Sequence, residues 1–207
     1  MFVDDDDDDD DKDFDLDNKK TKPMTIYNKH KIFITRISKG SYDIRLQMFN
    51  PHINLYSLVD FGTLPYIGIL NKNVFETISI HDVTESSAII FILAHDFFKT
   101  FGIQQKYLFL KSHKHENEQR NSKSFTVTNI ESKPFIQREK LSQLIIQSLA
   151  FKVSKLDSNS IDINCHLSFA IPFPLPLFVE KLAIKIVVKL IKVTKKHFES
   201  MKLFQKF

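Results

Sequence analysis

The chain has 207 residues, of which 43% are hydrophobic and 26% are charged, and its formal net charge is +4. These proportions are those of an ordinary globular protein, so they exclude a fully disordered regulator and a coiled coil, and the length suits one large domain. A single cysteine, Cys165, excludes an internal disulfide and a cluster of thiolate metal ligands.

The small net charge conceals an uneven distribution. Residues 1–17 hold eleven aspartates and one lysine, a net charge of −10, whereas the remaining chain holds 28 basic and 14 acidic residues, a net charge of +14. Because such dense like charges repel, we expect residues 1–22 to form a disordered acidic tail and residues 23–207 to form one domain. The N-terminus lacks the basic and apolar regions of a signal peptide, so a cytosolic or nuclear location is the default. We expect a cytoplasmic protein, with peripheral membrane association as an alternative.

Two segments after the acidic tail have the pattern of a β-hairpin. Lys31–Ser38 is rich in β-branched residues, Tyr42–Phe49 alternates apolar with polar residues, and Gly40 lies in the turn between them. Ile53–Asp60 then has the apolar spacing of a short amphipathic helix, and Pro65 follows it as a helix breaker.

Six further segments predict strands, because they are rich in β-branched and aromatic residues or alternate apolar with polar ones. Loops are expected at Phe97–Gln105, which holds an aromatic cluster, and at His113–Lys123, which is polar and charged. One of the six, Leu141–Val153, is ambiguous between helix and strand, and we interpret it as a strand with a bulge. The segments are Val74–Ile80, Ser86–Ala94, Lys106–Leu110, Ser124–Thr128, Leu141–Val153 and Ile161–Ala170.

The last segment, Leu177–Phe207, predicts one long helix. It contains no glycine or proline, its lysines recur every three or four residues on one face, and apolar residues cover the other face. A helix of nearly thirty residues would be roughly 45 Å long and could lie across a sheet. The order of elements therefore predicts an α+β fold, with a curved antiparallel sheet wrapped around the long C-terminal helix and short helices near the N-terminus. The lysines of the face are Lys181, Lys185, Lys189, Lys192 and Lys196.

The sequence offers little that indicates catalysis or metal binding. His113 and His115 lie near two glutamates in the predicted polar loop, where solvated side chains are a simpler interpretation than a metal site. Cys165 and His166 are adjacent in a predicted strand and should point to opposite faces, so they do not form a catalytic pair. With four glycines in the chain and no phosphate-binding loop, we expect no catalytic residue, no metal and no cofactor.

Several segments, in this order, resemble START-type lipid-transfer domains, within the helix-grip superfamily that includes plant Bet v 1-like proteins. Asn54–Leu70 looks like the family's short helices, and Ser168–Val179 followed by the lysine helix resembles its proline turn and closing helix. The resemblance covers about residues 30–205, although Gln104–Lys106 stands where the family has an Arg-Asp pair, and the family's tryptophans are absent. The other similar segments are Asn71–Ile80, Ala88–Ala94, His95–Leu110 and Phe135–Ile146.

The resemblance implies a non-enzymatic carrier or sensor that binds a lipid or another hydrophobic small molecule between the sheet and the last helix. It also implies which apolar side chains line such a cavity, although plain core packing is the alternative for each. The expected lining residues are Phe91, Leu93, Phe109, Leu144, Ile146, Leu167 and Phe169 on strands, with Ile186, Val187 and Leu190 on the helix.

The lysine face of the last helix has three interpretations. It is a solvated face, a surface that docks on anionic lipid, or a surface that binds nucleic acid through its phosphates. We find no recognised nucleic-acid motif and expect no nucleic-acid partner. In the membrane interpretation the five lysines act together with aromatic residues that insert at the interface, namely Phe97, Phe98, Phe101 and Phe173.

Three functions follow from these observations. The first is binding of a lipid or other hydrophobic small molecule in an internal cavity. The second is a cavity-less docking module of the same fold that binds an anionic membrane or a protein partner, and the third is an enzyme of the polyketide-cyclase type. A further hypothesis is that the acidic tail folds back on the lysine face and competes with anionic membrane. The ligand and the oligomeric state do not follow from the sequence.

Overall fold

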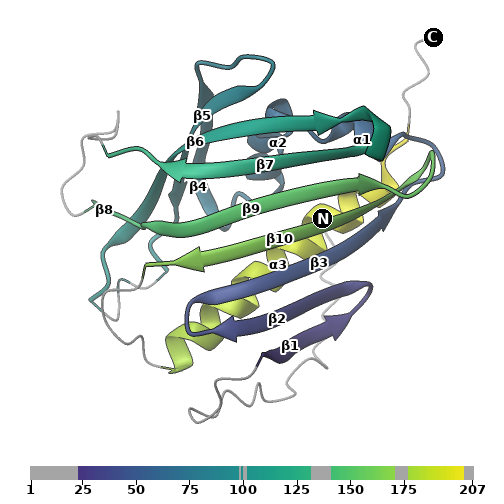
Figure 1. Cartoon of the computed structure of the whole chain (residues 1–207). Coiled ribbons are helices and arrows are strands. Elements are labelled where there is room, and N and C mark those ends of the chain that lie inside the picture. Colours follow the sequence, from purple (N-terminus) through teal and green to yellow (C-terminus); the bar gives the residue numbers. More distant parts are fainter. Residues whose placement is uncertain (1–22, 98, 100–101, 132–140, 171–176, 203–207) are drawn as a thin grey trace, which may run out of the picture.

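A computed structural model describes residues 23–97, 99, 102–131, 141–170 and 177–202, and it is drawn in Figure 1. The predicted acidic tail, Phe98, Phe101 and Phe173 lie outside the described residues. The division into a tail and one domain therefore stays a prediction.

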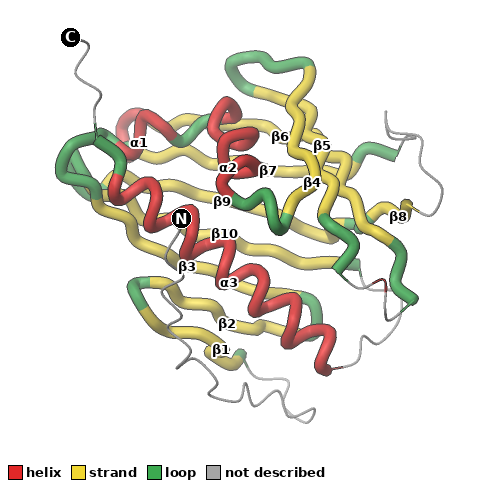
Figure 2. Tube along the Cα trace, turned by 180° about the vertical axis from the view of Figure 1, so that it is seen from behind, coloured by secondary structure: helices red, strands yellow, loops and turns green. Residues whose placement is uncertain are grey.

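The described chain forms a ten-stranded sheet with helices on one face (Figures 1 and 2). The strand order is β1-β2-β3-β10-β9-β7-β6-β5-β4; β8 pairs with β6 in parallel, and the other pairs are antiparallel. The long helix α3 crosses this face, and α1 and α2 lie beside its C-terminal half, so the predicted α+β architecture is confirmed. The strands are β1 (Met24–Lys29), β2 (Ile32–Ser38), β3 (Ser41–Phe49), β4 (Phe75–His81), β5 (Ser87–Ala94), β6 (Gln105–Asn117), β7 (Ser122–Asn129), β8 (Leu141–Gln143), β9 (Ile146–Lys155) and β10 (Ser160–Phe169). The helices are α1 (Leu55–Leu58), α2 (Leu64–Leu70) and α3 (Leu177–Ser200), with 3₁₀ turns η1 (Phe61–Thr63) and η3 (Glu118–Arg120).

The alternating strands behave as their sequences predict. In β10, Ile161 and Ile163 are buried toward the helices. His166 points to the outer face, where its Nδ1 lies 2.6 Å from Oδ1 of Asp43 on β3. β10 pairs with β3 over its length and occupies the middle of the sheet. The apolar side of each alternating strand therefore becomes the inner face, because that face is covered by helices.

The predicted polar loop at His113–Lys123 is wrong. Residues 113–117 are the end of β6, the turn η3 is tight, and β7 begins at Ser122. The charged residues of β6 that face inward have partners across the sheet face: Lys114 binds Asp60, and Glu116 accepts from Tyr56. A polar strand is stable here because its charges are paired with the α1–η1 segment, which a local pattern does not reveal.

Two other sheet elements differ from the prediction. Met24–Lys29 was not predicted to be a strand, yet it forms the edge strand β1, and its Ile26 and Tyr27 pack under α3. Leu141–Val153 was predicted as one strand, but it contains β8 and most of β9. The break occurs because β8 pairs in parallel with β6, whereas β9 pairs with β7 and β10.

The N-terminal end of α3 is held to the sheet by a buried charged group. Glu180 accepts a hydrogen bond from the Tyr42 hydroxyl (2.6 Å) and one from Nη2 of Arg36 (3.2 Å), and Nε of Arg36 lies 2.9 Å from its other oxygen. Burial, followed by the hydrogen bond to Glu180, raises the pKa of Tyr42 above its ordinary value. Arg36 belongs to β2 and Tyr42 to β3, so this contact fixes the first turn of α3 over that side of the sheet.

The C-terminal end of α3 is held by Asn50, which directly follows β3 and is 0% exposed. Its Nδ2 donates to the carbonyls of Phe198 (2.7 Å) and Met201 (2.9 Å), and its Oδ1 accepts from the backbone of His52 and Ile53. The last carbonyls of a helix lack partners within the helix, so this side chain satisfies them and ends α3 at a fixed place.

Replacing Asn50 by Asp should destabilise the fold by at least about 2 kcal/mol. The carbonyls of Phe198 and Met201 would lose the amide group that donates to them, and a carboxylate oxygen would face them instead. Urea unfolding measures the change in the free energy of unfolding. Asn73→Asp is the matched control, since Asn73 is exposed, and it should change stability by less than about 0.5 kcal/mol. Equal effects of the two substitutions would contradict the role given to Asn50.

Candidate functional site

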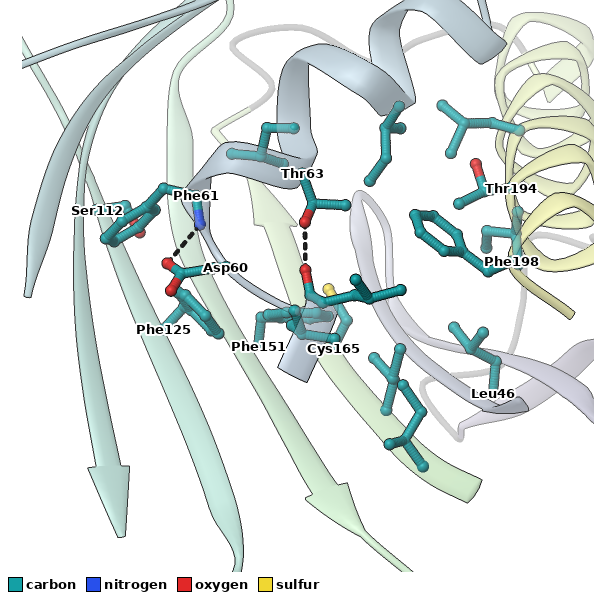
Figure 3. A pocket seen from close by; sticks show the side chains of 18 of the residues that line it. Leu46, Asp60, Phe61, Thr63, Ser112, Phe125, Phe151, Cys165, Thr194 and Phe198 are labelled. Atoms are coloured by element: carbon teal, nitrogen blue, oxygen red, sulfur yellow. Dashed lines mark hydrogen bonds between the residues drawn. The ribbon is translucent and has the colours of Figure 1, made fainter. Parts of the chain in front are cut away.

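A cavity of about 350 Å³ lies between the inner face of the sheet, the α1–α2 segment and the C-terminal half of α3 (Figure 3). Residues Leu190 to Phe198 of α3 contribute one wall, and residues Leu55 to Ile67 contribute another. The sheet contributes the third wall through β3, β5, β6, β7, β9 and β10. The lining residues from these strands are Leu46, Met48, Ile90, Ile92, Leu110, Ser112, Phe125, Val127, Leu149, Phe151, Ile161, Ile163 and Cys165.

The strand contribution follows from the pleat of the sheet. Each of these strands supplies residues two positions apart, such as Ile90 and Ile92 on β5 and Leu149 and Phe151 on β9. Side chains at i and i+2 share one face of a strand. The cavity therefore has a floor of alternate apolar side chains, and it is bordered by three separate packed clusters rather than by one continuous core.

Three of the predicted lining residues lie in another part of the structure. Phe91, Leu93 and Phe109 pack with Tyr107 in a cluster formed by the other face of β5 and β6, where Phe91 pairs with Phe109 across the strands. Their neighbours Ile90 and Leu110, one position away, line the cavity instead. β5 is apolar on both faces, so its sequence does not reveal which set of alternate residues points inward.

The other predicted lining residues are divided between the cavity and its surroundings. Leu190 lines the cavity. Ile146 and Phe169 pack against Ile90 and Leu110 at its border, and Val187 packs with the cluster under the N-terminal half of α3. The remaining three are partly buried and lie outside the lining, namely Leu144, Leu167 and Ile186.

Asp60 is the acidic residue of the lining, and it is held in an ion pair. Its Oδ1 accepts a hydrogen bond from the backbone N–H of Phe61 (2.6 Å), and its Oδ2 accepts one from Nζ of Lys114 (2.9 Å) (Figure 3 shows the contact with Phe61). Burial acts to raise the pKa of Asp60, but these two hydrogen bonds and the lysine charge outweigh it and lower the pKa below its ordinary value. Asp60 is therefore ionised at neutral pH, and each of its two carboxylate oxygens already accepts a hydrogen bond from the protein.

Three further polar side chains of the lining also have partners within the protein. Thr63 donates to the carbonyl of Leu58, Thr194 accepts from Nδ2 of Asn71 (3.0 Å), and Lys195 donates to the carbonyl of Gln47 and to Glu199. Ser112 contributes a neutral hydroxyl from β6. The surface left for a ligand is thus almost entirely hydrocarbon.

Cys165 faces this cavity from β10, as expected for a residue on the apolar side of that strand. Burial, and to a smaller extent the charge of Asp43, raises the pKa of its thiol to about 11. The thiol is therefore protonated at neutral pH and is a poor nucleophile. His166 points away on the outer face, beside Asp43, so the two residues do not form a pair.

The lysine face of α3 is on the solvent side of the helix. Lys185, Lys189 and Lys196 are exposed, while Lys181 and Lys192 are half-buried, and Nζ of Lys192 lies 5.5 Å from the centre of the Tyr27 ring. The same helix also carries exposed apolar residues, namely Phe178, Leu182 and Val193.

Phe97, from the predicted aromatic loop, is half-buried. Its ring packs edge-on against the His95 ring, with the two ring centres 6.2 Å apart. His113 and His115 are exposed on β6. Among the residues that the structure describes, no group of three His, Cys, Asp or Glu side chains could hold a metal ion. Within the described ranges, none of the helices combines the length and the apolar character that crossing a membrane requires.

Because its pKa is raised to about 11, the thiol of Cys165 should react slowly with alkylating reagents. Compared with an exposed thiol of pKa about 9, its thiolate fraction at pH 8 should be about 100-fold lower, since the pKa differs by about two units. The rate of alkylation by iodoacetamide, followed by mass spectrometry, should fall at least as much. Ser158→Cys in a Cys165→Ser chain is the exposed control. Equal alkylation rates at the two positions would contradict the placement of Cys165.

The fold of this chain occurs in solved structures of low sequence identity. No protein-family model matches the chain, and no curated protein matches it.

Three solved structures are similar over most of their length. The human StarD13 lipid transfer and protein localization domain has 7% identity and a TM-score of 0.65, covering 87% of this chain and 90% of that one. Human StAR-related lipid transfer protein 5 has 9% identity and a TM-score of 0.62, covering 85% and 87%. A STAR-related lipid transfer protein fragment from Xanthomonas axonopodis has 6% identity and a TM-score of 0.62, covering 85% and 98%. The resemblance to START-type domains is confirmed as a shared helix-grip fold.

Proposed function

We propose that this protein binds a compact, uncharged apolar molecule in the cavity between the sheet, the α1–α2 segment and α3, and that it acts as a carrier or sensor without changing its ligand. The observation that carries the proposal is a cavity of about 350 Å³ with a hydrocarbon lining, in which Asp60, Thr63, Thr194 and Lys195 already have protein partners. Ligand pockets for small molecules are typically about 300–1,000 Å³, mostly apolar, with few polar groups.

The volume limits the size of the ligand. A buried apolar cavity of about 150 Å³ is large enough for benzene, so the space here suits a molecule of very roughly ten to twenty non-hydrogen atoms. A single aliphatic chain or a small ring system has this size, whereas a lipid with two chains would require the walls to move. A ligand with a charged group would leave that group unpaired in hydrocarbon, which is costly.

The lining also favours binding over catalysis. A cyclase-type enzyme needs acids, bases or nucleophiles that can reach the ligand. Here the carboxylate of Asp60 is bound by Lys114, the ammonium of Lys195 is bound by Glu199, and the thiol of Cys165 is protonated. The START-type structures with this fold carry lipid transfer in their names, which supports a lipid as one ligand class, although a shared fold does not fix a function.

A second proposal concerns α3, which carries exposed lysines and exposed apolar residues on one side. We propose that this side contacts anionic membrane through Lys185, Lys189 and Lys196, together with the exposed Leu182 and Val193 of the same helix. Each lysine near an anionic surface contributes about 1 kcal/mol, and apolar side chains add burial at the interface. Lys181, Lys192 and Phe97 belong to the same proposed contact.

Filling the cavity should weaken binding. Leu149→Trp places a larger side chain against the cavity, and we expect at least a tenfold loss of affinity for Nile red, an uncharged apolar dye, measured by fluorescence titration. The chain has no natural tryptophan, so blue-shifted emission from the new residue would show that it is buried. Cys165→Phe is a second filling variant, in case the first does not fold.

Leu156→Trp is the matched control, because Leu156 is 55% exposed and lies outside the lining. It should bind the dye as the unchanged protein does. If both filling variants fold and bind the dye with unchanged affinity, the ligand site is elsewhere and the proposal fails.

Replacing Lys185, Lys189 and Lys196 together by Gln should lower the affinity for vesicles containing phosphatidylserine at least tenfold, because three near-surface charges are removed. Vesicle flotation measures the bound fraction. The control replaces three exposed lysines outside α3, Lys39, Lys111 and Lys152, by Gln. The same loss in both triple variants would mean that net charge, and not this face of α3, governs membrane contact.

A further inference from the structure

The outward face of α3 carries positive charge that its own glutamates do not balance. The helix has six lysines and two glutamates. Glu180 is buried against Arg36 and Tyr42, and Glu199 accepts from Lys195 and from the backbone N–H of Phe49. Both carboxylates are therefore used in contacts with the sheet or with the buried lysine. Lys181, Lys189 and Lys196 lie along this face in a row about 22 Å long at 1.5 Å per residue.

The described chain begins beside this row. Met24 pairs with Arg36 in the β1–β2 ladder, and Arg36 binds Glu180 in the first turn of α3. Met24 also packs against the cluster that contains Ile184 and Val188 of α3. The first described residues therefore lie next to the N-terminal end of the lysine row.

The segment before the described chain is long enough to reach along the lysines of α3, and its charge is opposite to theirs. Residues 4–17 carry a net charge of −10, and five residues, 18–22, connect them to Pro23. An extended chain spans about 3.3–3.6 Å per residue, so the connection reaches roughly 17 Å and the acidic segment can extend over more than 40 Å. The acidic segment is therefore long enough to follow the whole row from Lys181 to Lys196, which is about 22 Å long.

We infer that residues 4–17 dock along the outward face of α3, with aspartate carboxylates against Lys181, Lys189 and Lys196, and that they keep this face from other anionic surfaces. A short connection gives the segment an effective concentration in the millimolar range, which favours contact within one chain over contact between chains. The contact is electrostatic and exposed, so it weakens as salt shortens the Debye length from about 10 Å at 0.1 M to about 3 Å at 1 M.

The exposed lysines on the outer face of the sheet fit the acidic segment less well. Lys111 and Lys152 lie on the outer face of the sheet, away from α3. That face also carries Asp43 and Asp162, which lie within ion-pair distance of His166 and Arg45. An acidic segment placed there would meet carboxylates as well as ammonium groups, whereas on the lysine row it meets lysines.

Carbodiimide cross-linking of the full chain tests the inference directly, because it joins a carboxylate to an amine only when the two are in contact. Mass spectrometry at about 20 mM salt should find links from the aspartates of residues 4–17 to Lys181, Lys189 and Lys196, and about 0.5 M salt should remove them. Links to Lys19, Lys20 and Lys22 follow from proximity in the chain and serve as the reference for yield. Equal yields at Lys111 and Lys152 would overturn the inference.

Two companion measurements complete the test. Cross-linking a mixture of isotope-labelled and unlabelled protein should give links within one copy, and links between copies would overturn the intramolecular contact. A variant with all eleven aspartates of residues 1–17 changed to Asn should bind phosphatidylserine vesicles at least tenfold more tightly at low salt, and unchanged affinity would show that the segment does not shield the face. Nile red binding, which depends on the cavity, should not change, so this test is independent of the ligand proposal.

Discussion

The fastening of α3 to one side of the sheet is the constraint on which the rest of the structure depends. Both ends of the helix are held by residues of β2, β3 and the turn that follows β3: Arg36 and Tyr42 at the first turn, Asn50 and the carbonyl of Gln47 at the last turns. A helix of 24 residues is about 36 Å long and behaves as a stiff rod. Fixed at both ends over β2 and β3, it does not close onto β5, β6 and β7. The α1–α2 segment covers that side instead, and the cavity is the space between the two coverings.

The cavity remains apolar because its polar surroundings are paired with one another. Lys123 of β7 is only 6% exposed; its ammonium group donates to the carbonyls of Tyr56 (3.2 Å) and Val59 (3.3 Å) at the end of α1. With the ion pair between Lys114 and Asp60, this holds the covering segment to the sheet by charged hydrogen bonds at its edge. Leaving the ammonium groups of Lys114 and Lys123 unpaired would cost free energy, so these contacts fix the position of α1 and η1. The hydrocarbon side chains behind them then face the cavity.

The fold was predictable wherever one face of an element differs from the other. The alternation in β3 and β10, and the lysine and apolar faces of α3, predict their elements and which side packs inward. β5 is apolar on both faces, so the pattern gives a strand without saying that Ile90, and not Phe91, faces the cavity. In Ser124–Thr128 the alternation does single out Phe125 and Val127, which line the cavity and which a strict use of that pattern would have found. The end of β6 was missed because its charges are paired with a distant segment, and no local pattern records such a partner.

Native mass spectrometry of the protein purified from a eukaryotic host tests the central claim most directly. The account predicts a bound species heavier than the chain by the mass of one small apolar molecule, lost under denaturing conditions and lost from the cavity-filling variant. A protein that is empty after purification and that takes up neither uncharged lipids nor Nile red would contradict it. In that case the helix-grip fold would serve as a docking module, and the lysine face of α3 would be the site to study.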